Sequence, residues 1–286
     1  PLLRLFFNDA CLYGVGAPFF LLLTFRVKAE PVPKRSLRFG SWLIAFLIAA
    51  FFVETSATVS FNVIDTVTQL LGFHTSDRIQ NVSTNVPLWA VFLFNVVIPP
   101  LGEEFLFRRC LLDRLRPYGE KSAALISAFA FALFHINAYQ FSYTLLLGLL
   151  LAYLYLKTGR LRYCSAIHAG VNLVFGVFPE LVDRYGNTEW LSRALSNGSF
   201  DLSELTGATL WGTLFYACYL LLINGLVIAG LIFFIRKIGR VRWAQGSCHL
   251  SGGRTVLRLV RNPFVWIYVS VTVLLALYYL LLSTLS

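Results

Sequence analysis

Two adjacent carboxylates, Glu103 and Glu104, stand at the end of a hydrophobic run that begins at Val86 and is long enough to enter a lipid bilayer. Ionisable side chains at such depth are costly and usually mark a functional site. On a helix, Glu104 shares a face with Arg108, four residues later, so these two side chains can pair. Glu103 lies about 100° further round the helix and has no such partner. The spacing therefore predicts one supporting glutamate and one glutamate that is free to do chemistry.

Two more polar clusters interrupt apolar segments further along the chain. They read Phe131-x-x-x-His135 and His168-x-x-x-Asn172, and each spacing places its two residues on one helical face. A single histidine inside an apolar helix is more often a packing residue than a functional one. Three polar clusters in neighbouring segments favour a shared site.

A hairpin would bring the first two clusters together. The turn at 117–119 reads Pro-Tyr-Gly and predicts an antiparallel helix pair. At 1.5 Å per residue, Glu103 and His135 would then be level within about 3 Å. The same count along straight helices leaves His168 about 15 Å too far toward the cytoplasm. A strong tilt, or a connection at 137–140 sunk below the outer surface, would be needed to bring it level.

These residue types suit peptide hydrolysis, which needs a general base, donors for the tetrahedral oxyanion and a shielded water. Glu103 would be the base. Asn172 offers an amide donor, and His168 offers an N–H in the appropriate tautomer. Phe131 lies one turn from His135, where it would either wall the site or pack in the core.

A metal-assisted form of the same chemistry uses the same side chains. Glu103, His135 and His168 could hold a divalent ion such as zinc that activates the water. The HExxH motif of many zinc peptidases is absent from the sequence, and the residues do not decide between the two forms. The five cysteines are scattered without CxxC spacing and predict neither a disulfide framework nor a structural zinc site.

The elements that must position these residues are membrane helices. The 286-residue chain is 57% hydrophobic and only 13% charged, and its mean hydropathy is +0.70. Several apolar runs exceed the length that a membrane span needs. The sequence predicts an all-α, polytopic protein with a single integral membrane domain over 1–286, and no cleavable signal peptide. We expect about eight spans, at 10–25, 41–63, 87–107, 123–137, 141–156, 165–178, 209–235 and 263–282.

The basic residues indicate an orientation. Twenty of the 24 Lys and Arg residues fall in four alternate connections, at 26–38, 108–121, 157–162 and 236–261. The two other long connections, 65–86 and 179–207, are expected to be extramembrane loops on the opposite side. The positive-inside rule places both termini outside the cytoplasm. The net charge of +10 then reflects topology and contact with the lipid bilayer, and no nucleic-acid partner is expected.

The order EExxxR, FxxxH, HxxxN on membrane helices resembles the CPBP family, which includes the type II CAAX prenyl endopeptidases and bacteriocin-immunity-like (Abi) proteins. The motif-bearing catalytic core spans 87–178. The resemblance implies a CAAX prenyl protease-like bundle that trims a C-terminal tripeptide after a prenylated cysteine. It also implies roles: Glu103 and His135 activate water, His168 and Asn172 stabilise the oxyanion, and Glu104 and Arg108 support them.

Three functions follow in order of preference. The first is an intramembrane endopeptidase that cleaves a peptide or protein, possibly lipidated, near a membrane surface. The second is a non-proteolytic, immunity-type protein of the same fold that binds a partner peptide; the intact motifs argue against it. The third is a transporter with Glu103 and His135 as a proton relay. Transporters often show repeated halves, and no repeat is evident here.

Overall fold

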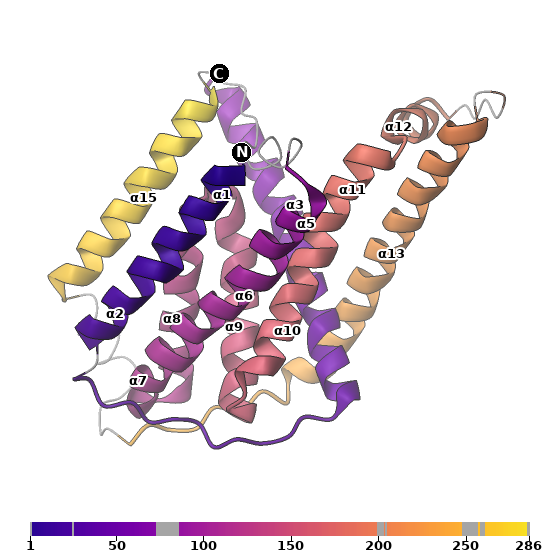
Figure 1. The fold of residues 1–286 in the computed structure, drawn as a ribbon. Helices are drawn as coiled ribbons and strands as arrows, with labels where there is room; N and C mark the ends of the chain where they lie inside the picture. Colours follow the sequence, from indigo (N-terminus) through magenta and orange to yellow (C-terminus); the bar gives the residue numbers. More distant parts are fainter. Residues whose placement is uncertain are drawn as a thin grey trace.

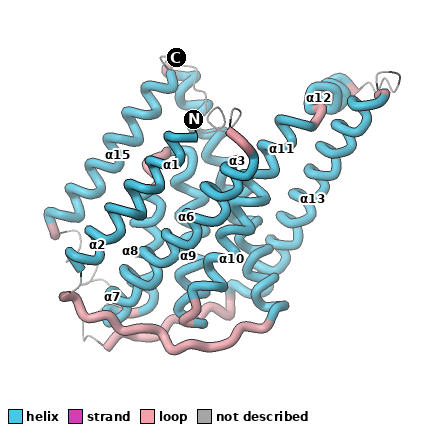
Figure 2. Tube along the Cα trace, in the orientation of Figure 1, coloured by secondary structure: helices cyan, strands magenta, loops and turns pink. Residues whose placement is uncertain are grey.

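The chain folds into a bundle of helices in the computed structural model, which describes residues 2–24, 26–72, 86–198, 203, 205–247, 257 and 261–284. The described elements are helices and loops (Figures 1 and 2). In chain order they are α1 (Leu2–Asp9), η1 (Ala10–Gly16), α2 (Ala17–Thr24), α3 (Phe39–Leu70), α5 (Leu88–Phe92), η2 (Leu93–Val97), α6 (Ile98–Glu104), η3 (Phe105–Leu112), α7 (Asp113–Leu115), η4 (Arg116–Tyr118), α8 (Glu120–Phe134), α9 (Ala138–Thr158), α10 (Leu161–Asn172), η5 (Leu173–Val177), α11 (Phe178–Tyr185), α12 (Thr188–Asn197), α13 (Gly207–Ile238) and α15 (Pro263–Thr284).

The all-helical, polytopic character that the sequence predicts is confirmed. Within the described residues, five helical runs are long and apolar enough to cross a membrane: Phe39–Leu70, Leu88–Tyr118, Ala138–Thr158, Leu161–Tyr185 and Gly207–Ile238. Two shorter apolar helices, Ala10–Leu22 and Val265–Leu281, correspond to the first and last predicted spans. The fourth predicted span falls on α8, whose 15 residues are fewer than the roughly 20 that a span needs. The total of eight spans therefore stays a prediction.

Three connections expected as loops are more helical than predicted. The helix α3 continues to Leu70, into the predicted loop 65–86, of which 73–85 lie outside the described residues. The predicted loop 179–207 contains most of α11 and all of α12. The basic connection 108–121 is mostly the end of the run Leu88–Tyr118. These segments are polar overall. An amphipathic helix needs apolar residues on one face only, so a search for long apolar runs does not detect it.

The described parts of the basic connections gather at one end of the bundle (Figure 1). The loop between α2 and α3 runs along this end and is tied to two other helices. Glu30 N donates to Asp113 O at 2.9 Å and Arg35 N donates to Thr158 O at 2.8 Å. The first turn of α1 and the last turn of α15 lie toward the other end (Figure 1). The predicted orientation depends on this separation of the basic connections from the two outer helix ends. Which end of the bundle faces the cytoplasm stays a prediction.

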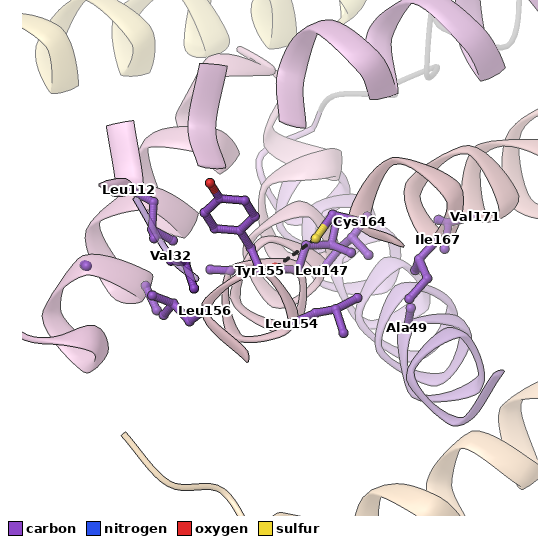
Figure 3. Close-up of a cluster of buried hydrophobic side chains, with 14 of the residues drawn as sticks. Val32, Ala49, Leu112, Leu147, Leu154, Tyr155, Leu156, Cys164, Ile167 and Val171 are labelled. Carbon is purple, nitrogen blue, oxygen red and sulfur yellow. Dashed lines mark hydrogen bonds between the residues drawn. The ribbon is translucent and has the colours of Figure 1, made fainter. Parts of the chain in front are cut away.

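The central helix is α9, which packs against α8 and α3. The core cluster around it includes Leu151, Tyr155 and Ile167, all fully buried. Figure 3 shows Tyr155 and Ile167 in this cluster. Gly148 lets α8 approach closely, because a Cβ at this position would meet the Phe131 ring at 3.1 Å and Ala128 Cα at 3.2 Å. On the other side of α9, the Cys164 thiol of α10 donates to Leu151 O at 3.5 Å. The core thus fixes α8, α9 and α10 against each other. Four of the candidate site residues lie on α8, directly after it or on α10.

Candidate active site

Glu104 and Arg108 form a buried ion pair at the centre of the bundle. Both side chains are 0% exposed, and Arg108 Nε donates to Glu104 Oε2 at 2.8 Å. Arg108 Nη1 donates to Ser127 Oγ at 3.1 Å, and this hydroxyl donates to Phe107 O at 2.8 Å. The pairing predicted from the four-residue spacing is confirmed. A charge buried this deeply is tolerated only when its hydrogen bonds are made, and this pair ties α6 and η3 to α8.

His168 connects the two glutamates. Its ring is 3% exposed, and its Nδ1 lies 3.1 Å from Glu104 Oε1. Its Nε2 lies 3.8 Å from Glu103 Oε2. A carboxylate only accepts hydrogen bonds, so Nδ1 carries the hydrogen in this contact. The second nitrogen, Nε2, is thereby presented to Glu103.

Glu103 is the half-satisfied member of the pair. Its side chain is buried, with 6% of the residue exposed. Its Oε1 accepts a hydrogen bond from the Tyr13 hydroxyl at 2.9 Å. Its Oε2 is buried and has no hydrogen-bond partner among the described residues. The sequence predicts that Glu103 has no partner on its own helix, and this holds, although a distant helix supplies one for Oε1.

His135 faces the same oxygen from α8. Its Nδ1 lies 2.9 Å from Phe131 O, one turn back along the helix, and its Nε2 lies 4.0 Å from Glu103 Oε2. A backbone carbonyl only accepts, so Nδ1 again carries the hydrogen and Nε2 is left with its lone pair. The level predicted for Glu103 and His135 from the 117–119 turn matches their positions.

Three acceptor atoms therefore converge on one point. Glu103 Oε2 lies within 4.0 Å of both imidazole Nε2 atoms, and neutral rings with Nδ1–H offer no donor there. Such a pocket is satisfied by a group that brings hydrogens or positive charge: a water, an added proton or a cation. A water placed there would be polarised by a carboxylate and an imidazole at once, which is the arrangement that general-base catalysis requires.

Phe131 lies beside both imidazole rings and is fully buried. Its ring centroid lies 4.8 Å from the His135 ring and 5.7 Å from the His168 ring, both edge to face. Arg108 Cζ lies 5.2 Å from the same centroid. Phe131 is a core residue, packed with Leu106 and Phe107; its role as a wall of the site stays a prediction.

Asn172 lies one turn beyond His168 and is half-buried. Its Nδ2 donates to Asn95 O in η2 at 2.8 Å. This bond uses one of the two amide hydrogens and fixes the side chain, while the other hydrogen is left to donate. The bond holds Asn172 between α10 and the run that carries both glutamates.

The expected depth mismatch of His168 is wrong. The straight-helix count assumes that α8, α9 and α10 are parallel and that each begins level with the end of the one before it. In the structure, Phe131 lies level with Gly148 on one side of α9, and Cys164 lies level with Leu151 on the other. One turn after Cys164, His168 thus reaches the Phe131 ring. The contacts of α9 with α8 and with α10 set the level of His168, and a count along straight helices does not include them.

Sequence reasoning missed Tyr13, Ser127 and Asn95, which contact the predicted residues from other segments. Tyr13 is 90 positions from Glu103 and Asn95 is 77 positions from Asn172, so no helical spacing relates them. Gly102, directly before the glutamates, was a usable signal, because a glycine there permits close approach of another helix. It did not identify which helix.

Short π-helical segments interrupt the helices that carry the site. They are η2 with Asn95, η3 with Arg108, η5 directly after Asn172, and η1 with Tyr13. π-helical turns are rare and frequently occur at functional sites. Their extra residue rotates the side chains on one side of the segment relative to the other, so regular helical spacing does not carry through them.

The donor set was also compared with the needs of a metal ion. One carboxylate and two imidazoles are suitable ligands, and an acceptor on each Nδ1 is the usual outer arrangement of metal-binding histidines. The three ligand atoms are separated by 3.8 and 4.0 Å, wider than the roughly 3.3 Å implied by tetrahedral zinc. Among the described residues, no group of three or more His, Cys, Asp and Glu meets the geometry of a metal site. The residue types therefore suit a metal ion, but their spacing is wider than a bound zinc ion would require.

Comparison with known families agrees with the geometry. Residues 85–174 match the family model described as type II CAAX prenyl endopeptidase Rce1-like. This segment is an Rce1-like domain. The Rce1-like domain contains all three motifs and ends two residues after Asn172. No curated protein and no solved structure matches the chain. Tyr13 lies outside the matched segment, on a helix that packs against it.

The family match suggests an intramembrane peptidase, and the resemblance noted from the motifs is confirmed. The Rce1-like domain supplies Glu103, Glu104, His135 and His168, which the structure brings into one buried cluster. Outside this segment, the long helices α3 and α13 expose many large apolar side chains. The chain is thus a multi-pass, membrane-type protein with a buried acid–imidazole centre.

Proposed function

We propose that this protein is an intramembrane endopeptidase that hydrolyses a peptide bond near the membrane surface. The observation that carries the proposal is the unpartnered Glu103 Oε2, which faces the Nε2 atoms of His135 and His168 inside a helical bundle. A buried carboxylate oxygen without a donor is costly. A site that retains one is suited to hold the water that would satisfy it.

The first chemical step uses Glu103 and His135. A water in the acceptor pocket donates one hydrogen to Glu103 Oε2 and directs its lone pair at the scissile carbonyl carbon. As the new C–O bond forms, the proton passes to Glu103, and the carbonyl electrons move onto the oxygen. His135, in contact with the same water, accepts its second hydrogen bond and fixes its orientation.

The oxyanion is stabilised from α10. Asn172 retains one free amide N–H for this purpose. His168 donates through Nε2 only when both of its nitrogens are protonated, because Nδ1–H is engaged by Glu104. When the tetrahedral intermediate collapses, Glu103 returns its proton to the leaving amine and the C–N bond breaks.

Glu104 and Arg108 act through His168 rather than on the substrate. The pair holds Nδ1 at 3.1 Å from Glu104 Oε1 and thereby fixes both the tautomer and the ring orientation. Access is from the side of His135, whose side chain is 17% exposed against 3% for His168. The substrate class that the family match suggests is a peptide or protein with CAAX-type C-terminal processing, including lipidated forms.

The proposal includes about eight transmembrane helices in one integral membrane domain, with both termini outside the cytoplasm. The support is that the described parts of the Lys- and Arg-rich connections lie at one end of the bundle (Figure 1). Epitope tags at each end of the chain, probed with antibody before and after cell permeabilisation, measure the orientation. Tags reachable only after permeabilisation would reverse it.

The test of the activity is cleavage of a peptide library, with and without C-terminal lipidation, by purified protein in liposomes. Wild type is compared with Glu103→Gln, His135→Ala and His168→Ala, each with and without chelator. We expect Glu103→Gln to lose cleavage by at least about 100-fold, the lower range of general-base contributions. The matched control is Glu120→Gln, which alters a similarly buried glutamate, 7% exposed, that pairs with Lys157 instead.

The outcomes separate the alternatives. Cleavage that disappears in Glu103→Gln and persists in Glu120→Gln supports the proposal. Loss of activity with chelator and its return with zinc would show that the Glu103, His135 and His168 ligand set acts through a metal. An inactive wild type with intact insertion would favour the non-proteolytic, partner-binding function.

A further inference from the structure

Tyr13 reaches the centre of the site from a helix that carries none of the motifs. Its hydroxyl donates to Glu103 Oε1 at 2.9 Å, across 90 positions of sequence. Its ring packs with Ala17 and Phe20 against the cluster formed by Leu106, Phe107 and Phe131. Tyr13 therefore contacts both the general base and this aromatic cluster.

The local sequence is adapted to this contact. Gly102 directly precedes the glutamate pair, and a Cβ there would lie 2.5 Å from Tyr13 Cδ1 and 2.7 Å from Cε1. No residue other than glycine leaves room for the Tyr13 ring in its present position. Tyr13 itself lies in the π-helical segment η1, and such segments frequently accompany functional sites.

The bond restricts the carboxylate. A free glutamate carboxylate rotates about its last torsion with two broadly equivalent orientations. With Oε1 held by Tyr13, Oε2 is the oxygen that faces both imidazoles, at 3.8 and 4.0 Å. The hydroxyl also donates to the ionised form of the acid, which is the form that accepts a proton from water.

We infer that Tyr13 is a positioning residue for Glu103: it holds one carboxylate oxygen so that the other faces His135 and His168. The inference rests on the proposed function for its kinetic effect, although the contact itself does not. Because Tyr13 lies outside residues 85–174, the first apolar helix becomes part of the site rather than a peripheral span.

The chain offers a matched control in Tyr268. Its hydroxyl donates to Ala130 O at 2.9 Å, from α15 to α8, and it contacts no site residue within the described structure. Tyr13→Phe and Tyr268→Phe each remove one hydroxyl that ties an outer helix to the bundle. A purely structural role would make the two variants alike.

The first arm of the experiment measures steady-state cleavage in liposomes with the best peptide of the library. Tyr13→Phe is expected to lower kcat on the order of ten-fold, the size of one hydrogen bond to a charged group, while KM changes less than about two-fold. Tyr268→Phe is expected to keep wild-type kcat and KM. Gly102→Ala should lower kcat like Tyr13→Phe, because its methyl group displaces the ring. Gly225→Ala, at a position with open space around it, should not.

The second arm does not depend on cleavage. Dicyclohexylcarbodiimide, an apolar reagent, modifies protonated carboxyl groups, and mass spectrometry gives the ratio of label on Glu103 to label on Glu54 of α3. The ratio is expected to rise several-fold in Tyr13→Phe and to stay unchanged in Tyr268→Phe. Glu103→Gln has no carboxyl group at this position, so the peptide that loses its label in this variant is the one that contains Glu103.

The results decide two questions separately. If wild type cleaves no peptide, the proposed function fails, and a raised labelling ratio in Tyr13→Phe still supports the role of Tyr13. Wild-type kcat in Tyr13→Phe, a raised KM with unchanged kcat, or an unchanged labelling ratio would each overturn the inference.

Discussion

The polar centre of this protein has two halves that begin from adjacent residues and differ in how completely they are bonded. The half around Glu104 is closed: both oxygens contact Arg108 or His168, and all of its side chain is buried. The half around Glu103 is open, since Oε1 is bonded to Tyr13 and Oε2 has no partner in the part of the chain that the structure describes. Burial is similar, so the difference lies in the partners.

The comparison shows how one helix can provide a stabilising acid and a reactive acid side by side. Glu104 and Arg108 are four residues apart and share a helical face, so they pair. Glu103 lies about 100° round the helix from Glu104 and faces away from this arginine. His168 contacts both acids and couples the halves through its two nitrogens. We therefore expect substitutions in the closed half to change stability and substitutions in the open half to change chemistry.

The largest expected effect on stability is that of Glu104→Gln. It leaves Arg108 charged, buried and without its counter-charge, which costs about 3–5 kcal/mol of unfolding free energy. Glu103→Gln should change the unfolding free energy by less than about 1 kcal/mol, because its amide can accept from Tyr13 and donate to the imidazoles. Unfolding in mixed detergent micelles, followed by circular dichroism, measures both. Equal losses in the two variants would erase the distinction between the halves.

Ser127→Ala should have an intermediate effect within the closed half. The hydroxyl accepts from Arg108 Nη1 and donates to Phe107 O, and the serine is fully buried. Its removal leaves a buried guanidinium N–H without a partner, at a cost of about 1–3 kcal/mol. The same unfolding measurement checks this value. A change in unfolding free energy near zero would mean that a water molecule replaces the hydroxyl and that water enters the half around Glu104.

The smallest effect is expected for Glu180→Gln, which tests whether environment rather than spacing matters. Glu180 and Arg184 are also four residues apart and joined at 2.7 Å, but the Arg184 side chain is 21% exposed. Glu180 itself is buried, with 6% of its side chain exposed, but Arg184 reaches solvent and its Nη2 also donates to Val86 O at 2.8 Å. The arginine therefore keeps partners when the carboxylate is lost, so the change should be about 1 kcal/mol. A loss as large as that of Glu104→Gln would contradict the role assigned to burial.

Local spacing predicted the parts of the site that lie on one helix or one hairpin. The Glu104–Arg108 pair follows from helical geometry alone, and the level of Glu103 with His135 follows from the turn at 117–119. The family resemblance followed from the same motifs. The two contacts could be predicted because one helix, or one short hairpin, sets the distance between the residues.

The remaining contacts depend on packing between helices, which local spacing does not encode. His168 reaches the site because Gly148 and Leu151 set the levels of α8 and α10 on either side of α9. Tyr13 and Asn95 reach it from segments 90 and 77 positions away. Helical segments such as α12 were missed because they are amphipathic and polar rather than long and apolar.

The most direct measurement is kcat/KM of Glu103→Gln and Glu104→Gln on one cleaved peptide, normalised to the folded fraction of each protein. The account predicts that Glu103→Gln loses at least about 100-fold while its folded fraction matches wild type. It predicts that the folded part of Glu104→Gln retains more activity than Glu103→Gln. An inactive but stable Glu104→Gln beside an active but unstable Glu103→Gln would reverse the two halves and contradict the account.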